Sequence, residues 1–339
     1  SLVVRRLVFN DAFLKIDHFK RETQFHENKY KKKSILLTQK ILDSIGNQNA
    51  NYELKDVSIL MFLSKSSEDI NLITKAIKLL LKHTKIPSDQ INGIGAQLMR
   101  LTYILDQPDL GLKILQDKEL ADIFKSSYPK LILMNKLMTE NRYEQVIDLF
   151  EKFLVQYNDT KGRKDNKFIF PHDQFVLVSI ALYKMNSKEA FDKMVNIMKS
   201  IKIRRLEFVN TSLTRCFALA INQKEPEYGL KLVSKFDNLN VALGFNLSII
   251  ALSRMGFIEE ALKIVQNVID TKLDPDSSKF EGRFFRTTIK ILDEQIKSCK
   301  FIESVNGKSK IKFDLLKSLI DNDKRYLKFD IQDLCQKPM

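Results

Sequence analysis

Six dipeptides, each a small or β-branched residue followed by a large apolar one, recur along the chain at intervals of 35, 35, 44, 39 and 32 residues. They are Ala76-Ile77, Gly111-Leu112, Val146-Ile147, Ala190-Phe191, Gly229-Leu230 and Ala261-Leu262. A small residue at a fixed place in a repeat lets paired helices approach closely, and a period of about 20–50 residues is typical of stacked repeat arrays. The spacing crosses the middle of the chain and therefore predicts one array rather than two globular domains.

Apolar residues recur with the period of a helix. In residues 69–82, Ile70, Ile73 and Ile77 form one stripe while Lys75 and Lys78 face away. Similar stripes occupy 131–138, 143–154, 175–184, 190–198, 213–222, 228–236, 245–255 and 259–269. Only 10 Gly and 7 Pro occur in 339 residues, too few for the turns of a β-rich protein. We expect an all-α chain.

One 35-residue unit, 242–276, carries a family signature. It has Gly256 between two helical stretches, Glu259-Glu260-Ala261-Leu262 opening the second, and Pro275-Asp276 at its end. At these residues the chain resembles the pentatricopeptide repeat family, and 127–156 is a weaker match. The tetratricopeptide repeat is the alternative helical-hairpin family, but its sequence pattern includes Trp, and the chain contains no Trp.

The resemblance covers residues 57–276 and implies an all-α, right-handed α-solenoid of about six or seven helical hairpins. We expect an N-terminal helical cap at 1–56, the repeat array at 57–276 and a C-terminal helical cap at 277–339. Both caps are atypical, as solenoid ends are. Within them, helices are predicted at 36–45 and 287–297, a loop at 306–308 and further helix from residue 313.

The residues that support catalysis or metal binding are sparse. Three Cys and four His lie far apart, and neither a phosphate-binding loop nor a nucleophile motif occurs. Asp274 and Asp276 flank Pro275, which the end of a repeat explains better than a metal pair. We therefore expect no enzyme, cofactor or metal. Charged residues interrupt every apolar run before the ~20 residues of a membrane span, so no span is expected.

The charge favours an anionic partner, because 56 Lys+Arg against 42 Asp+Glu give a net charge of +14. Lys184 and Arg254 occupy matching places near the ends of first helices and are candidate phosphate contacts. Two basic clusters are further candidates; they are Lys161, Arg163 and Lys164, and Lys199, Lys202, Arg204 and Arg205. Each cluster could equally be a solvated face.

The resemblance also implies base selection by the fifth and last residues of each repeat, with the second packing on the base. In the best unit these are Asn246, Asp276 and Leu243, a combination that would favour uridine. Of the other fifth positions only Thr214 could hydrogen-bond, because Ala96, Leu131 and Val176 are apolar. Shape, stacking and phosphate contacts would then carry most of the recognition.

The resemblance implies a mitochondrial matrix protein that binds single-stranded RNA. It would stabilise a messenger, such as one for a respiratory-chain or ATP synthase subunit, or promote its maturation or translation. Two alternatives remain open: a mitochondrial ribosome subunit or assembly factor, and a helical-repeat protein-interaction scaffold. The ribosome or RNA-processing proteins are then possible partners. Because the chain begins at Ser1, we expect that an N-terminal segment, including any targeting peptide, has been removed.

Overall fold

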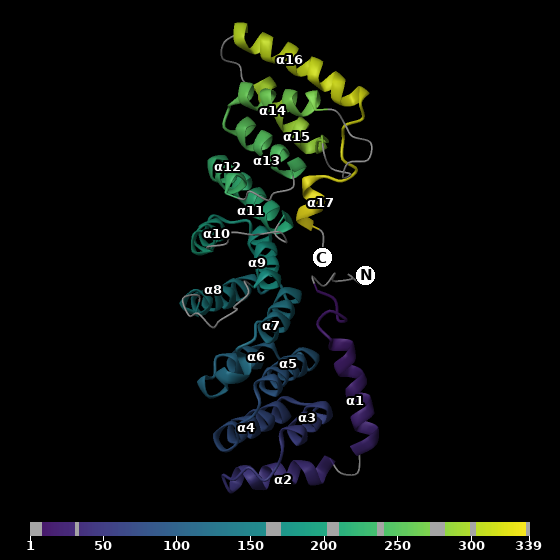
Figure 1. Cartoon of the computed structure of the whole chain (residues 1–339), viewed down its shortest axis with the longest axis vertical. Coiled ribbons are helices and arrows are strands. Elements are labelled where there is room, and N and C mark those ends of the chain that lie inside the picture. Colours follow the sequence, from purple (N-terminus) through teal and green to yellow (C-terminus); the bar gives the residue numbers. More distant parts are fainter. Residues whose placement is uncertain are drawn as a thin grey trace. The chain divides into compact units, whose positions relative to one another are not determined.

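A computed structural model describes residues 9–30, 34–160, 171–201, 210–235, 241–271, 282–298 and 303–336. Within these ranges the chain is helical, with seventeen α-helices and one 3₁₀ helix. The described residues contain no β-strand; a single bridge pairs Phe284 with Tyr326. The expected all-α fold is confirmed (Figure 1).

The chain divides into two compact units, residues 1–149 and 150–337. The first unit contains α1 (Ile16–Tyr30), α2 (Ser34–Gly46), α3 (Leu54–Leu63), α4 (Ser67–His83), α5 (Ser88–Ile104), α6 (Pro108–Leu115), η1 (Lys118–Phe124), α7 (Tyr128–Thr139) and the start of α8 (Tyr143–Thr160). The second contains the end of α8, then α9 (His172–Met185), α10 (Lys188–Ser200), α11 (Asn210–Asn222), α12 (Pro226–Ser234), α13 (Val241–Arg254), α14 (Ile258–Asp270), α15 (Arg286–Ser298), α16 (Glu303–Asn322) and α17 (Ile331–Gln336).

Consecutive helices pair into hairpins, as the period predicts. The first helix of each hairpin, here called the A helix, is α3, α5, α7, α9, α11, α13 or α15, and the B helix follows it. Within the first unit α3 packs on α5 and α5 on α7; within the second, α9, α11, α13 and α15 pack in sequence. Seven hairpins therefore lie in the described residues, in agreement with the expected six or seven.

The small residues of the repeated dipeptides lie at the helix contacts. All six, Ala76, Gly111, Val146, Ala190, Gly229 and Ala261, are buried in B helices. A Cβ on Gly111 would lie 3.0 Å from Leu133 Cδ1 in α7 and 3.2 Å from Thr102 Oγ1 in α5. The B helix therefore packs against the A helices of its own hairpin and the next, which is the close approach that the dipeptides predict.

The turns between A and B helices share one backbone geometry. In five successive hairpins, from α5–α6 to α13–α14, one turn residue has a positive φ: Asp106, Asn141, Asn186, Lys224 and Gly256. Only the last is a glycine, although the left-handed conformation costs other residues about 1–2 kcal/mol. The packing of the two helices therefore holds the turn in this geometry.

The ends of the chain differ in part from expectation. The helices predicted at 36–45 and 287–297 correspond to α2 and α15. The loop predicted at 306–308 is wrong, because α16 runs through it. Gly307 has open space around it, and the helix is anchored further on by buried Phe313, Leu316 and Ile320. Helix α1 was not predicted, and the division into three domains stays a prediction.

Candidate functional site

The predicted base-selecting residues of the second unit are buried. Asn246 in α13 is 0 % exposed, and its Nδ2 donates to the carbonyls of Ala242 (2.7 Å) and Arg283 (3.1 Å). Its Oδ1 accepts from the backbone N–H of Phe285 at 2.9 Å. One of these bonds stays within α13, and the other two join α13 to the residues just before α15. The amide is therefore occupied by the fold, and its role in base selection stays a prediction.

The other candidates on the A helices are equally enclosed. Thr214 is 0 % exposed and its hydroxyl donates to Asn210 O, one turn back in α11. Leu243 is 6 % exposed and lines an apolar pocket with Phe285 and Phe329. The remaining fifth positions, Ala96, Leu131 and Val176, are also buried. Asp276 lies outside the described residues.

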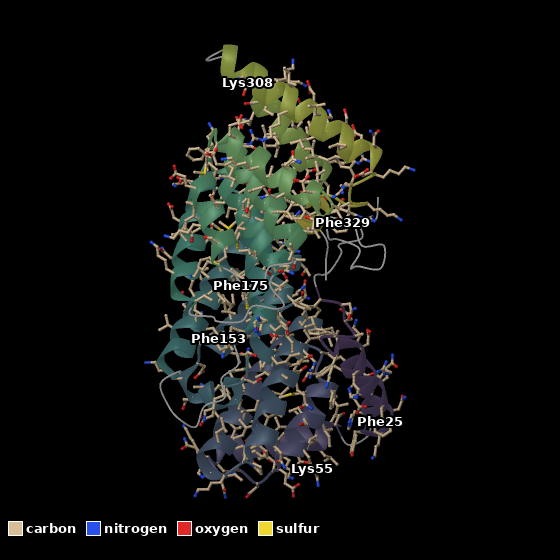
Figure 2. The ribbon with its side chains drawn as sticks, turned by 45° about the horizontal axis from the view of Figure 1, so that its top comes forward. Phe25, Lys55, Phe153, Phe175, Lys308 and Phe329 are labelled. Atoms are coloured by element: carbon tan, nitrogen blue, oxygen red, sulfur yellow. The ribbon has the colours of Figure 1, made fainter. Side chains whose placement is uncertain are left out.

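In the second unit, residues 323–336, here called the C-terminal strap, run back over the A helices. At its start, the Arg325 guanidinium donates to Val268 O and Ile269 O, both at 2.9 Å, and so satisfies carbonyls in the last turn of α14. The strap then pairs with the residues before α15, where Leu327 N donates to Phe284 O at 2.9 Å. Phe329, which is labelled in Figure 2, lies edge-on to Phe285 with 5.9 Å between ring centroids.

The strap ends on α11. Asp330 Oδ2 accepts from the backbone N–H and hydroxyl of Thr287 at the start of α15, at 3.0 and 2.9 Å. Further on, the guanidinium of Arg215, 0 % exposed in α11, donates to Cys335 O in the last turn of α17 at 3.1 Å. In this unit the C-terminal strap therefore covers the surface of the A helices on which the resemblance places RNA bases.

The predicted phosphate contacts that the structure describes are exposed. Lys184 and Arg254 stand two residues before the left-handed residues Asn186 and Gly256, which confirms their matching places in two hairpins. Arg254 lines a groove of about 310 Å³ beside α17, together with Lys290. Lys199 is exposed in the last turn of α10. Lys161, Arg163, Lys164, Lys202, Arg204 and Arg205 lie outside the described residues, and all these phosphate contacts stay predictions.

The first unit has a larger cleft, here called the cationic cleft, of about 700 Å³. Residues of α1, α3 and α5 line it. These helices pack together in the first unit, where Figure 1 shows α1 beside α3 and α5. The lining residues come from the segment before α1, from the start of α1, and from α3, α5 and α7; they are Ala12, Lys15, Asp17, His18, Phe19, Arg21, Phe62, Gly93, Ala96, Gln97, Arg100 and Tyr128. The lining therefore contains three Lys or Arg side chains and one His, but only one carboxylate, that of Asp17.

Packing holds the cleft in shape. Ile16 and Phe19 of α1 are buried, and the Phe19 ring lies 4.8 Å from that of Phe62 in α3. His18 and Arg21 follow one another at an interval of three residues in α1, and Lys15 precedes the helix with a left-handed φ of 56°. All three are exposed and line the cleft. Within the described residues no hydrogen bond or ion pair engages these three side chains. They are therefore available to an anionic ligand.

Two groups on the floor of the cleft are held by the backbone of residues 9–15, here called the N-terminal segment. Arg100 Nε donates to Leu14 O at 2.8 Å, and the Tyr128 hydroxyl donates to Phe13 O at 2.8 Å. The guanidinium also lies 5.4 Å from the centre of the Tyr128 ring. A cation and an aromatic face are thus fixed side by side, the pair of groups that stacks bases and binds phosphates.

Sequence reasoning missed this cleft. The signal available was the cluster of basic residues Lys15, His18 and Arg21 around the apolar Ile16 and Phe19. Among the described residues no group of His, Cys, Asp and Glu could hold a metal ion. Of the helices that the structure describes, none is long and apolar enough to cross a membrane.

Comparison with known proteins gives a consistent set of relatives. No protein-family model matches the sequence. "Pentatricopeptide repeat-containing protein 2, mitochondrial" of Mus musculus is 24 % identical over 284 residues, 84 % of this chain and 70 % of the mouse protein. The proteins of the same name from Pongo abelii and Homo sapiens are 27 % identical over 191 residues, 56 % of this chain. The match spans 46 % and 45 % of those two proteins.

These similarities relate the chain to the pentatricopeptide repeat proteins, as the motif in 242–276 indicates. Each relative is named as a mitochondrial protein, which supports a mitochondrial location for this chain.

Proposed function

We propose that this relative of the pentatricopeptide repeat proteins binds single-stranded RNA in mitochondria and so stabilises a transcript or promotes its maturation or translation. The observation that carries the proposal is the cationic cleft, where Lys15, Arg21 and Arg100 surround aromatic and apolar side chains. A polyanion with stackable bases fits such a lining better than an acidic peptide does, because the partly exposed ring of Tyr128 lies beside the Arg100 cation.

The net charge of the whole chain supports the same partner. An excess of fourteen positive charges draws a phosphate backbone toward the protein over about a Debye length. In the second unit, Lys184, Arg254 and Lys199 add exposed cations at the ends of helices. We propose these as secondary phosphate contacts.

The proposal is tested by fluorescence anisotropy with a labelled 20-nucleotide RNA across a salt series. Contact with about four phosphates gives a log–log slope near −3, so raising the salt from about 50 to about 200 mM weakens binding about fifty-fold. The double variant Lys15→Glu/Arg21→Glu should bind at least tenfold more weakly, with a flatter slope.

The matched control is Lys75→Glu/Lys113→Glu, which makes the same charge change at exposed sites on the B helices α4 and α6. Wild-type affinity in the control and weak binding in the cleft variant would support the cleft as the RNA site. Equal losses in both would show that only net charge matters. Salt-independent binding would favour a protein-interaction scaffold. Crosslinking of RNA to the native protein, followed by sequencing, then separates messenger from ribosomal RNA.

A further inference from the structure

The cationic cleft is closed on the side of α7. The N-terminal segment lies across α5 and α7, and its buried Phe9 exchanges two hydrogen bonds with the side chain of Asn135 in α7. Phe9 N donates to Asn135 Oδ1 at 3.2 Å and Asn135 Nδ2 donates to Phe9 O at 3.4 Å. The Phe9 and Phe13 rings stack 4.9 Å apart. A strand lying in the cleft therefore cannot continue along the A helices to α7.

The side of α3 is occupied by α1 itself. Phe19 and His26 of α1 both pack on Phe62, the latter with ring centroids 4.8 Å apart and planes 4° from parallel. The A-helix surface on both sides of the cleft is thus covered by the chain. Such a site favours the end of a strand over an internal nucleotide, because an internal nucleotide needs an exit for the backbone on each side.

The charge of the lining favours a terminal phosphate. Lys15, Arg21 and Arg100 face a single lining carboxylate, Asp17. A phosphomonoester carries close to two negative charges at pH 7, whereas an internal phosphodiester carries one. The N-terminus of α1, a helix of fifteen residues, also opens at the cleft and adds the partial positive charge of its dipole. The volume of about 700 Å³ falls in the range of ligand pockets, about 300–1,000 Å³.

We propose that the cationic cleft binds the phosphorylated end of an RNA strand, with the terminal phosphate held by Lys15, Arg21 and Arg100 and the end nucleotide against the ring of Tyr128. The inference rests on the proposed RNA binding. It lies outside the repeat positions that select bases, because Lys15 and Arg21 both precede the repeat array and Ala96, a fifth position, offers only a methyl group to the floor.

The test compares one 12-nucleotide sequence in four forms: with a 5′-phosphate, with a 3′-phosphate, with hydroxyls at both ends, and circularised. The full chain is titrated with each. We expect one phosphorylated end to bind on the order of tenfold more tightly than the hydroxyl form, and the circle to bind no better than the hydroxyl form. The 5′ and 3′ arms identify which end is held.

The variant Lys15→Gln/Arg21→Gln should lose the preference for the phosphorylated end, while Lys75→Gln/Lys113→Gln should keep it. Circular dichroism checks that both variants are folded. Equal affinity for all four RNAs would overturn the end-binding inference and leave RNA binding in place. Absence of binding to any of them would refute the proposed function and the inference together.

Discussion

The side chain of Asn246 offers the sharpest test of how this chain departs from the repeat pattern. Two of its three hydrogen bonds connect α13 to Arg283 and Phe285, before α15, and the third returns to Ala242 within α13. Asn246→Ala removes these bonds and leaves Phe285 N and Arg283 O without this partner. At about 1 kcal/mol for each bond, with a further penalty for a buried unpaired group, the loss in unfolding free energy is about 3–4 kcal/mol.

The assay is urea unfolding of the full chain, followed by circular dichroism and by intrinsic tyrosine fluorescence. Ser248→Ala on the same helix is the matched control, since Ser248 makes one local bond to Gly244 O and its loss should cost under about 1 kcal/mol. RNA binding by Asn246→Ala, measured below its unfolding midpoint, should keep the wild-type base preference, because the amide is buried in the folded protein.

The opposite pair of results would refute a purely structural role for Asn246. If Asn246→Ala unfolds within about 0.5 kcal/mol of the wild type and loses a preference for uridine, the amide contacts a base and not the fold. A variant that is both destabilised and altered in base preference would mean that the segment before α15 moves when RNA binds.

Two further predictions concern backbone geometry and a buried charge. Lys224, exposed and left-handed at φ 63°, should be replaceable by Gly with a gain of about 0.5 kcal/mol in thermal unfolding, whereas Lys231→Gly within α12 should lose about 1 kcal/mol. Burial lowers the pKa of Lys130, which donates to Phe124 O, from 10.5 to about 8. Between these values the unfolded chain binds more protons, so the stability of the wild type relative to Lys130→Met should rise by about 2 kcal/mol from pH 8 to 10.5 in urea titrations. A flat difference would show that the Lys130 amine is solvated.

The hairpins could be predicted from sequence because their determinants are local. The small residues of the dipeptides, such as Ala76 and Gly111, recur at one place in each B helix, and the apolar stripes repeat with the helical period. The left-handed turn residues follow almost the same spacing, at 35, 45, 38 and 32 residues. Each signal lies within one hairpin or between neighbours.

The candidate site could not be predicted in the same way, because it depends on contacts between distant residues. Arg100 meets Leu14 across 86 residues, and Phe9 meets Asn135 across 126. From the sequence alone, Arg215 would be predicted to lie on the exposed face of its helix. In the structure it is fully buried and donates to Cys335 O of the C-terminal strap. A repeat motif likewise carries no information about segments outside the array, such as the residues before α15 that hydrogen-bond to Asn246.

The C-terminal strap changes how the second unit can fold. A plain repeat stack makes only neighbour contacts, so it can gain or lose hairpins one at a time from its end. Here Cys335 O accepts a hydrogen bond from Arg215, 120 residues earlier in the chain, and Arg325 in the same segment donates to Val268 O near the end of α14. The last hairpin can therefore unfold from its end only if the contact between the C-terminal strap and α11 also opens. During synthesis, or during threading through a membrane pore, the unit stays incomplete until its final helix has emerged. Long-range closure of this kind slows folding and makes unfolding cooperative.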